Sequence, residues 1–334
     1  MDRYRMLWFC GVNNERMRGL IMADGRENEQ RTIWDIRYVK LHFRCRVTEN
    51  CQMPVNKTSA LRGGMGDVLL SAHCIYPGDK RCSGCSFETE CLVRRIMYSK
   101  YDIRPGFVTT GESIGYVICC ENYRTAFKEG DTLDFTMTLF GKTIVYFTTI
   151  LLAFYQLGQV GIGREKAGFM IERVTNTTGE TLVEGNNVFK EKYKVHLLGD
   201  YIAYRMEKET GNRLHFHTPL SIRQKGVELT GFDAEALVNA AARRLYMFDC
   251  FEGIEAEKIM IPRNELPQIL MQKVIPTKVR RYSSTHGEGI YLSGIRGDVE
   301  FDGLRDEVRR LMLATEVMHV GRNTSFGFGR VTVL

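Results

Sequence analysis

Four of the ten cysteines lie close together in the chain and could share one metal ion. They follow the spacing C-x7-C-x2-C-x5-C and are Cys74, Cys82, Cys85 and Cys91. A C-x2-C pair with two further thiols nearby supplies the four sulfur ligands of a tetrahedral Zn²⁺, which stabilises a loop with few apolar residues of its own. We therefore predict a structural zinc site. Because the spacing is not that of two paired C-x2-C motifs, a loop of free cysteines is the alternative, and an iron–sulfur cluster is a further one.

The chain ends with a second chemically distinctive segment, HVGRNTSFGFGRVTVL, which begins at His319. Glycine lets backbone N–H groups approach an anion without a Cβ in the way, and successive N–H groups can form an anion-binding concavity. Arg322 and Arg330 add planar, charged hydrogen-bond donors that suit phosphate. The segment therefore predicts a phosphate-binding loop, and a tight turn between a helix and a strand is the alternative.

Seven histidines are candidates for moving protons near neutral pH, because the unperturbed pKa of imidazole is about 6.5. Two of them stand beside other polar groups of interest. His42 lies among basic residues, and His73 immediately precedes Cys74. The remaining candidates are His196, His215, His217, His286 and His319.

The elements that must position these residues follow from hydrophobic periodicity. Residues 38–47 alternate strictly, which predicts a half-buried strand. Its polar face carries Lys40, His42, Arg44 and Arg46, with about 7 Å between successive members, so this face could follow a polyanion. A solvated outer face is the alternative. A helix over 58–73 with N-caps at Thr58 and Ser59, strands over 115–120 and 132–140, an apolar helix over 142–157 and a strand at FMIERV are expected next.

A similar order recurs in the second half of the chain. We expect strands over 194–205 and 214–222, a helix capped by Asp233, strands over 279–283 and 290–301, a helix from Leu304 and a last strand. The repeat distance of about 160 residues is domain-sized and indicates two copies of a split βαβ unit. The fold class is therefore α+β, with tandem ferredoxin-like (RRM-like, βαββαβ) domains. We expect an extension over 1–35, domains over 36–180 and 190–334, and a turn or linker over 176–192.

Composition adds bounds on the class of protein. The chain has 334 residues and a formal net charge of +6, which is compatible with a polyanionic partner but does not establish one. Its N-terminal segment lacks a secretory pattern, and the apolar run from Thr143 is shorter than the ~20 residues of a membrane span. We expect a cytoplasmic protein with reduced thiols and no membrane contact.

Several motifs in succession carry a resemblance to a known family. They are LRGGMGDVLLSAHC, CSGCSFETEC, GIGREKAGF, FHTPLSIRQKG, AARRLYMFDCF, SGIRGDVEF and HVGRNTSFGFGRV. In this order the chain resembles the CRISPR-associated repeat-processing endoribonucleases of the RAMP superfamily, over residues 36–334. The order of the motifs is more specific than any one of them.

The resemblance implies a pair of ferredoxin-like RAMP domains with a C-terminal glycine-rich loop. It also implies an enzyme that binds the repeat of a precursor CRISPR RNA and cuts it without a metal or other catalytic cofactor. The cut would proceed by attack of a 2′-hydroxyl and leave a 2′,3′-cyclic phosphate. The expected partners are repeat or guide RNA and other CRISPR effector subunits. The expected RNA-binding residues are Lys40, Arg44, Arg46, Arg62, Gly321, Arg322, Gly327, Gly329 and Arg330.

The catalytic histidine is not fixed by a motif in this family, but it tends to lie in or shortly after the first helix. His73 is therefore the first candidate, with Tyr76, Lys80 and Arg81 nearby in the chain, and His42 is the second. His73 has alternative roles as a helix cap, as a support for Cys74 or as a zinc ligand. Two other functions remain open: a non-catalytic RAMP subunit that binds guide RNA inside an effector complex, and a RAMP fold used only for interaction.

Overall fold

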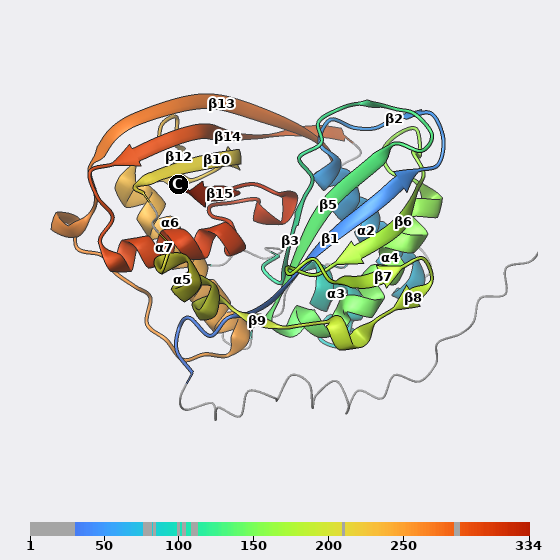
Figure 1. Cartoon of the computed structure of the whole chain (residues 1–334), viewed down its shortest axis with the longest axis horizontal. Helices are drawn as coiled ribbons and strands as arrows, with labels where there is room; N and C mark the ends of the chain where they lie inside the picture. The colour runs from blue at the N-terminus through green and yellow to red at the C-terminus, as the bar shows by residue number, and fades with distance from the viewer. Residues whose placement is uncertain are drawn as a thin grey trace, which may run out of the picture. The chain divides into compact units, whose positions relative to one another are not determined.

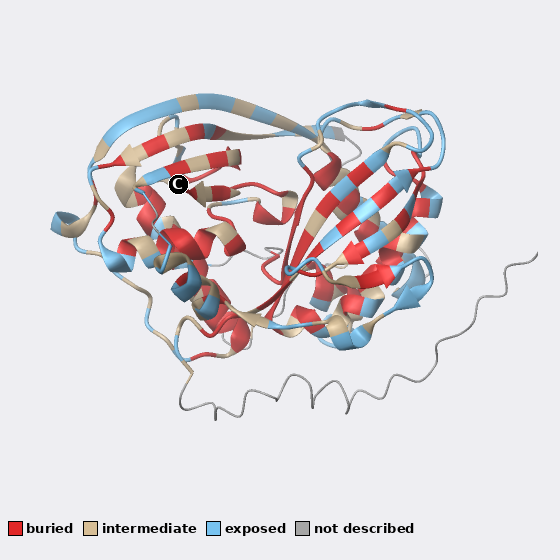
Figure 2. Cartoon of the chain, in the orientation of Figure 1, coloured by how far each residue is buried: buried red, intermediate tan, exposed pale blue. Residues whose placement is uncertain are grey.

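The chain forms two βαββαβ units, each built on its own antiparallel sheet. The computed structural model describes residues 31–75, 82, 85–98, 101, 105–107, 113–208, 211–283 and 288–334. Figure 1 shows the two units, and Figure 2 shows that each sheet turns a buried face toward its helices. The first thirty residues of the predicted extension lie outside the described residues.

The first unit has the order and sheet arrangement of a ferredoxin-like domain. Its strands pair in the order β3-β5-β1-β6, and every neighbouring pair is antiparallel. The elements are β1 (Arg37–Val47), α2 (Lys57–His73), β3 (Tyr116–Cys119), β5 (Thr132–Phe140), α4 (Phe147–Val160) and β6 (Phe169–Thr175). Smaller elements are β2 (Cys51–Gln52), α3 (Leu92–Met97), β4 (Ala126–Phe127) and the 3-10 helix η2 (Gly141–Tyr146).

The second unit repeats this arrangement with a four-stranded sheet. Its strands pair in the order β13-β14-β10-β15. The elements are β10 (Arg213–Leu220), α6 (Ala234–Glu252), β13 (Ile269–Ser283), β14 (Glu288–Phe301), α7 (Asp306–Met318) and β15 (Val331–Val333), with short pieces at β11 (Arg223–Gln224), β12 (Val227–Glu228), η4 (Arg263–Glu265) and η5 (Thr324–Phe326). The predicted fold class, tandem ferredoxin-like domains, is confirmed.

Helix starts show how local sequence sets these elements. The Asp233 carboxylate accepts a hydrogen bond from Ala236 N at 2.7 Å and begins α6, as the sequence predicts. Helix α2 is capped instead by Asn56, whose Oδ1 accepts from Ser59 N at 3.3 Å. The predicted caps, Thr58 and Ser59, lie two and three residues too late, because both are also of residue types that favour the cap position.

The apolar run from Thr143 forms a core helix of the first domain. By length and composition alone, the segment Gly141–Val160 could cross a membrane. Half of its apolar stretch is buried inside the protein. Buried residues of α4, such as Ile150 and Phe154, pack with Phe43 and the rest of the first core. The aromatic rings of Phe43 and Phe154 lie 5.3 Å apart.

The segment 176–192, predicted as a turn or linker, begins with a turn and continues as an extension of the first sheet. A turn over 176–180 leads into β7 (Thr181–Glu184), which pairs with β6, and β8 (Asn187–Val188) pairs with β7. The sequence NTTGETLVEGNN contains two tight turns, and the short strand between them was read as loop because it is so short.

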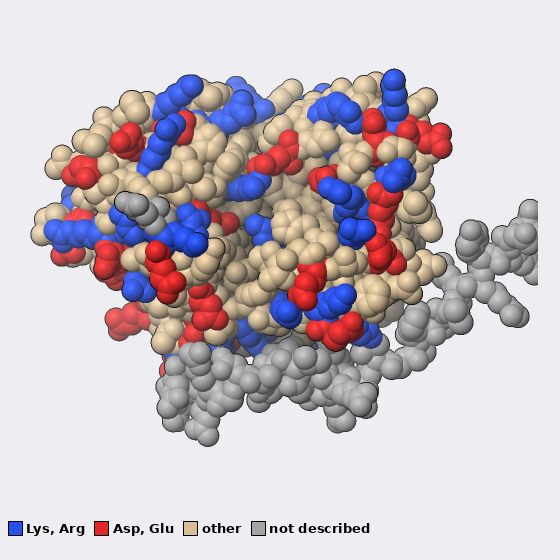
Figure 3. Space-filling view, in the orientation of Figure 1, with Lys and Arg blue, Asp and Glu red and all other residues tan. Residues whose placement is uncertain are grey.

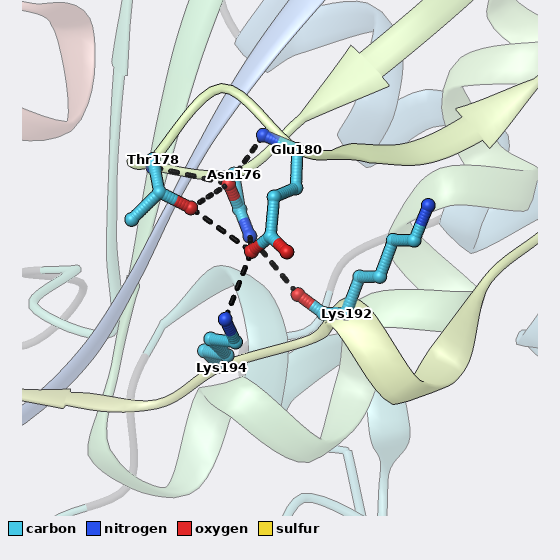
Figure 4. Close-up of polar contacts among 5 residues, drawn as sticks. All are labelled: Asn176, Thr178, Glu180, Lys192 and Lys194. Carbon is cyan, nitrogen blue, oxygen red and sulfur yellow. Dashed lines mark hydrogen bonds and ion pairs between the residues drawn. The ribbon is translucent and has the colours of Figure 1, made fainter.

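The first of these turns is held by side-chain hydrogen bonds (Figure 4). Asn176 Oδ1 accepts from Thr178 N at 3.0 Å and from Glu180 N at 2.9 Å. Glu180 in turn accepts from Lys194 Nζ at 3.0 Å, and Asn176 Nδ2 donates to the carbonyl oxygen of Lys192 at 3.1 Å. These bonds lower the pKa of Glu180 to about 2, with the bond from Asn176 the largest cause. The network ties the turn to the chain that leaves the first domain.

The segment 194–205, predicted as a strand, is mostly helix. Only β9 (His196–Leu197) is extended, and α5 (Leu198–Met206) follows it, after the 3-10 helix η3 (Lys190–Lys192). Leu198 and Ile202, four residues apart, are the buried residues of α5. That spacing is helical, and the prediction of a strand here was wrong because two buried residues give too weak a periodic signal.

The two domains are joined by an apolar contact and by a buried ion pair. Tyr38 and Phe140, at the ends of β1 and β5, belong to the core of the second domain, where the rings of Phe140 and Phe248 lie 4.5 Å apart. Beside them the Glu252 carboxylate, fully buried at the end of α6, accepts two hydrogen bonds from Arg37 Nε at 3.1 Å. Residues 32–334 therefore form one compact unit.

Candidate nucleic-acid interface

The glycine-rich loop between α7 and β15 packs against both domains. A Cβ on Gly327 would lie 3.0 Å from the carbonyl oxygen of Ile118 and 3.1 Å from the Thr58 methyl group, both in the first domain. Gly327 also has a φ of +81°, a conformation that favours glycine. Close approach to β3 and α2 therefore requires glycine at this position.

The other two predicted glycines are also in positive-φ positions close to backbone. A Cβ on Gly321 would lie 2.6 Å from the carbonyl oxygen of Ser221, and one on Gly329 would lie 1.8 Å from that of Val320. These contacts agree with the tight-turn interpretation of the loop. Contact between the loop glycines and RNA stays a prediction.

The two arginines of the loop face different neighbours. Arg322 is exposed and its guanidinium lies 3.7 Å from the Glu228 carboxylate. Arg330 is half-buried and forms an ion pair with Glu121, in the segment that follows β3 of the first domain. Arg330 thus reaches across from the second domain to the first.

On the outer face of β1, two basic side chains are paired with carboxylates and two are not, within the part of the chain that the structure describes. Arg44 pairs with Asp134 at 3.3 Å, and Arg46 pairs with Glu172. Among the described residues the side chains of Lys40 and His42 form neither a hydrogen bond nor an ion pair, while their backbones pair with β5. The face predicted from the alternation is confirmed as a strand face, and its first two polar residues are those left available for a ligand.

Lys40 and His42 both lie in the field of Arg330. The pKa of His42 is lowered, first by burial and then by the charges of Lys40 and Arg330. The pKa of Lys40 is lowered by burial and next by Arg330. Because His42 titrates below its ordinary range, its imidazole is neutral at pH 7 and able to accept a proton.

The second domain contributes a histidine to the same place. His217, on the outer face of β10, has its pKa lowered first by burial and then by Arg330, while Glu121 acts in the opposite direction. Its Nε2 lies 2.8 Å from Thr332 Oγ1 on β15. We call Lys40, His42, Glu121, His217 and Arg330 the interdomain cluster.

His215 packs against the His217 ring and is itself bonded to Asp298. The rings of His215 and His217 lie edge to face with centroids 4.6 Å apart, and His215 Nδ1 lies 2.9 Å from Asp298 Oδ1. Arg213 also bonds to Asp298 at 3.2 Å. Burial raises the pKa of Asp298, but the bonds from His215 and Arg213 outweigh it and lower the pKa. Asp298 is therefore a charged acceptor that fixes the His215 ring.

The arrangement suits a phosphodiester. In the view of Figure 3 the surface is hollowed between the two domains, and Lys and Arg side chains lie in the hollow. Cations stabilise the charge that develops on a phosphorus centre under attack, and a neutral imidazole can take the proton of the attacking hydroxyl. The cluster contains both kinds of group.

His73 lies elsewhere, at the last residue of α2. It is exposed, and the helix ends after it with a bond from Cys74 N to the carbonyl oxygen of Leu70 at 2.9 Å. Within the described chain His73 has no hydrogen-bond partner. Its predicted neighbours Tyr76, Lys80 and Arg81 lie outside the described residues.

The four cysteines of the predicted zinc site interact but do not form a metal-binding group. Burial raises the pKa of Cys82, Arg94 lowers it, and Cys91, Cys74 and Cys85 each raise it further. Within the part of the chain that the structure describes, no three cysteine, histidine or carboxylate groups are arranged to hold a metal ion. The structure gives the zinc prediction no support.

His319, beside the glycine-rich loop, is closed off from solvent. Its Nδ1 donates to the carbonyl oxygen of Phe328 at 3.0 Å, and burial lowers its pKa to about 3. The imidazole is therefore a neutral structural group that anchors the loop.

Two members of the interdomain cluster were not placed together by the sequence. His217 was only one of the remaining histidine candidates, and Glu121 was not singled out. Both meet Arg330 through contacts between segments about 110 to 210 residues apart, and single-sequence periodicity carries no signal for such pairing. The available signal was the alternation of HFHT, which places His215 and His217 on one face of a strand.

The fold consists of two ferredoxin-like domains with a glycine-rich loop before the last strand, which is the arrangement that the resemblance to the RAMP superfamily implies. Residues 214–331 match the family model described as CRISPR-associated endoribonuclease Cas6. Residues 36–197 match a model of an N-terminal domain, AF_1859_N. The second domain thus matches the Cas6 endoribonuclease model, in agreement with the resemblance found in the sequence.

Solved structures support the fold. A structure titled "Partial Cas6-RT-Cas1--Cas2 complex" has a TM-score of 0.53 at 11% identity and covers 91% of this chain and 47% of its own. The "Cas6-RT-Cas1--Cas2 complex" has the same TM-score and identity and covers 91% of this chain and 29% of its own. The chain therefore spans about half the length of the first of these proteins and less than a third of the second.

A further structure is Cas6 of Thermus thermophilus, with a TM-score of 0.48 at 10% identity, covering 90% of this chain and 99% of its own. No curated protein sequence matches the chain.

Proposed function

We propose that the protein is an endoribonuclease that binds the repeat of a precursor CRISPR RNA and cleaves it into guide RNAs by metal-independent general acid–base transfer. The Cas6 domain over residues 214–331 supports the substrate class. The observation that carries the mechanism is the position of Arg330, whose charge acts on His42 of the first domain and on His217 of the second.

In this mechanism neutral His42 takes the proton of the 2′-hydroxyl next to the scissile phosphate. The 2′-oxygen then attacks phosphorus, and the bond from phosphorus to the 5′-oxygen breaks. A general acid, His217, gives its proton to the leaving 5′-oxygen. The products are a 2′,3′-cyclic phosphate and a 5′-hydroxyl. Lys40 and Arg330 stabilise the negative charge on the phosphorane.

The bound phosphate also changes the protonation of the cluster. The phosphodiester of bound RNA carries a negative charge and raises the pKa of nearby histidines, because an opposite charge favours the imidazolium form. It also competes with the Glu121 carboxylate for Arg330. RNA binding therefore brings His217 toward the protonated state that a general acid needs.

The test compares single-turnover cleavage of the repeat RNA from the same locus in EDTA. His42→Ala should bind the RNA and cleave it ~10²–10⁴-fold more slowly, the usual range for one general acid or base. A 2′-deoxy nucleotide just upstream of the cut should allow binding and block cleavage. If His42→Ala is fully active and His73→Ala is slow, the active site lies at the end of α2 as the family tendency suggests.

One observation favours the alternative, a non-catalytic subunit that binds guide RNA in an effector complex. In the unbound protein both His42 and His217 have lowered pKa values, so neither is protonated at pH 7. A wild-type protein that binds the repeat tightly and never cuts it would establish this alternative. In either case we propose a cytoplasmic protein whose partners are repeat or guide RNA and other CRISPR-associated proteins.

A further inference from the structure

Two arginines from different domains meet at one aromatic ring of the glycine-rich loop. The guanidinium carbon of Arg62, on α2, lies 4.2 Å from the centroid of the Phe326 ring. That of Arg281, near the end of β13, lies 4.6 Å from the same centroid. Figure 1 shows how this contact arises, because the long hairpin of β13 and β14 reaches from the second domain to the first.

Within the described part of the chain neither guanidinium has an anionic partner. Among the described residues Arg62 donates from Nη2 to the neutral Ser113 Oγ at 3.3 Å and also bonds to the neutral Tyr116 side chain, and Arg281 forms no ion pair. The Nε atoms of both are buried without a hydrogen-bond partner in the same part of the chain. Arg37, another arginine between the domains, differs from these two because it forms an ion pair with the buried carboxylate of Glu252.

The two positive charges also act on each other. The pKa of Arg281 is lowered, first by burial and then by the charge of Arg62. The Phe326 ring offers its negative face to a cation, which offsets part of the desolvation cost, but a ring carries no net charge. Two half-buried like charges in one place favour binding of an anion, and no described residue supplies one.

We propose that Arg62, Phe326 and Arg281 form a clamp for one phosphodiester of the RNA backbone. The clamp rests on the proposed RNA-binding function and adds a site that lies apart from the interdomain cluster. Planar guanidinium forks match phosphate oxygens, and Phe326 holds both forks in place from the loop. Because Phe326 and Arg330 are four residues apart in one loop, a phosphate held by the clamp fixes the RNA strand relative to the cluster.

The clamp predicts a defined change in salt dependence. Arg62→Gln and Arg281→Gln should each weaken repeat RNA binding and reduce the slope of log K against log salt by about 0.7, one phosphate contact of a single strand. The double variant should lose the same single contact, because both arginines hold one phosphate. Arg280→Gln is the matched control. It removes the same charge from the residue before Arg281, which is exposed, and it should leave the slope nearly unchanged.

A second measurement needs no RNA. Inorganic phosphate should raise the melting temperature of the wild type and of Arg280→Gln, and this increase should be lost in Arg281→Gln. Arg62→Lys, which keeps the charge but not the fork, should retain part of it. Melting without phosphate and circular dichroism establish that each variant is folded.

The outcomes separate the clamp from the proposed function. Unchanged slopes in both Gln variants of a wild type that binds RNA would overturn the clamp and leave the function standing. Loss of the phosphate effect in Arg281→Gln, in a protein that never binds repeat RNA, would support an anion site for free phosphate and overturn the RNA clamp together with the function.

Discussion

Arg330 of the glycine-rich loop forms an ion pair with Glu121 of the first domain, so the arginine whose charge lowers the pKa of both His42 and His217 is paired with a carboxylate in the unbound protein. Both side chains are about one-third exposed, at 35% and 38%. A pair at this exposure contributes little to stability, typically about 0–1 kcal/mol. Its main effect is on the availability of Arg330 for phosphate.

Glu121→Gln should therefore strengthen RNA binding. Removing the Glu121 carboxylate frees Arg330 and also removes a negative charge that repels phosphate. The affinity for RNA should therefore rise about three- to tenfold, or about 0.7–1.4 kcal/mol. Affinity for repeat RNA at several salt concentrations measures the effect. Glu184→Gln is the matched control, because Glu184 pairs with Arg173 on the surface of the first sheet. Equal gains in the two variants would show that only net charge matters.

The pH dependence of cleavage should report the field around His42. A general base is inactive when protonated, so the single-turnover rate should fall as pH drops through the His42 pKa, which is lowered below about 6.5. Lys40→Met removes one of the two charges that lower this pKa. The acidic limb of the profile should therefore move to higher pH in Lys40→Met. A limb that stays in place in Lys40→Met would assign the titration to another group.

The parts of the fold that follow from local pattern could be predicted, and those that depend on distant contacts could not. Strict alternation identified β1, and Asp233 marked the start of α6, because both signals lie within a few residues. Helix α5 was mistaken for a strand because its buried face consists only of Leu198 and Ile202. In so short a helix the periodic signal is weak.

The candidate site divides in the same way. Lys40 and His42 were identified because they share the polar face of one strand. The pairing of Arg330 with Glu121 and the meeting of Arg62 and Arg281 at Phe326 depend on how two domains pack, and no spacing in the chain encodes them. The glycines illustrate a third case. The sequence indicated their conformational freedom, but their nearest neighbours are backbone atoms of the protein itself.

The zinc hypothesis makes a prediction that needs no assumption about geometry. If Cys74, Cys82, Cys85 and Cys91 bind zinc, elemental analysis of protein purified without added metal should find about one zinc per chain. Cys82→Ser should then lower the melting temperature, while cleavage by the remaining folded protein persists. Cys250→Ser, at a buried cysteine of α6, is the control for loss of a thiol alone. Metal-free wild type with an unchanged Cys82→Ser variant identifies the segment as a loop of free cysteines.

The Arg37–Glu252 pair should be the most sensitive polar contact between the domains. Glu252 is fully buried and Arg37 is 26% exposed. Removing one partner of such a pair leaves an uncompensated charge and typically costs about 3–5 kcal/mol. Glu252→Gln should therefore lower the free energy of unfolding by about 3 kcal/mol in urea melts, because Arg37 keeps some access to water. Glu184→Gln, which breaks a pair exposed at 50% and 57%, should cost about 0–1 kcal/mol.

A double variant distinguishes a buried charge from a packing role at this contact. Arg37→Met with Glu252→Leu removes both charges and keeps apolar bulk, so it should recover most of the stability lost in Glu252→Gln. If the double variant is as unstable as the single one, the hydrogen bonds of this pair, and not the unpaired charge, determine the stability of the interface. Repeat RNA binding should also be measured on the double variant. Weaker binding by a stable double variant would show that the Arg37–Glu252 pair is needed to position the two domains for RNA.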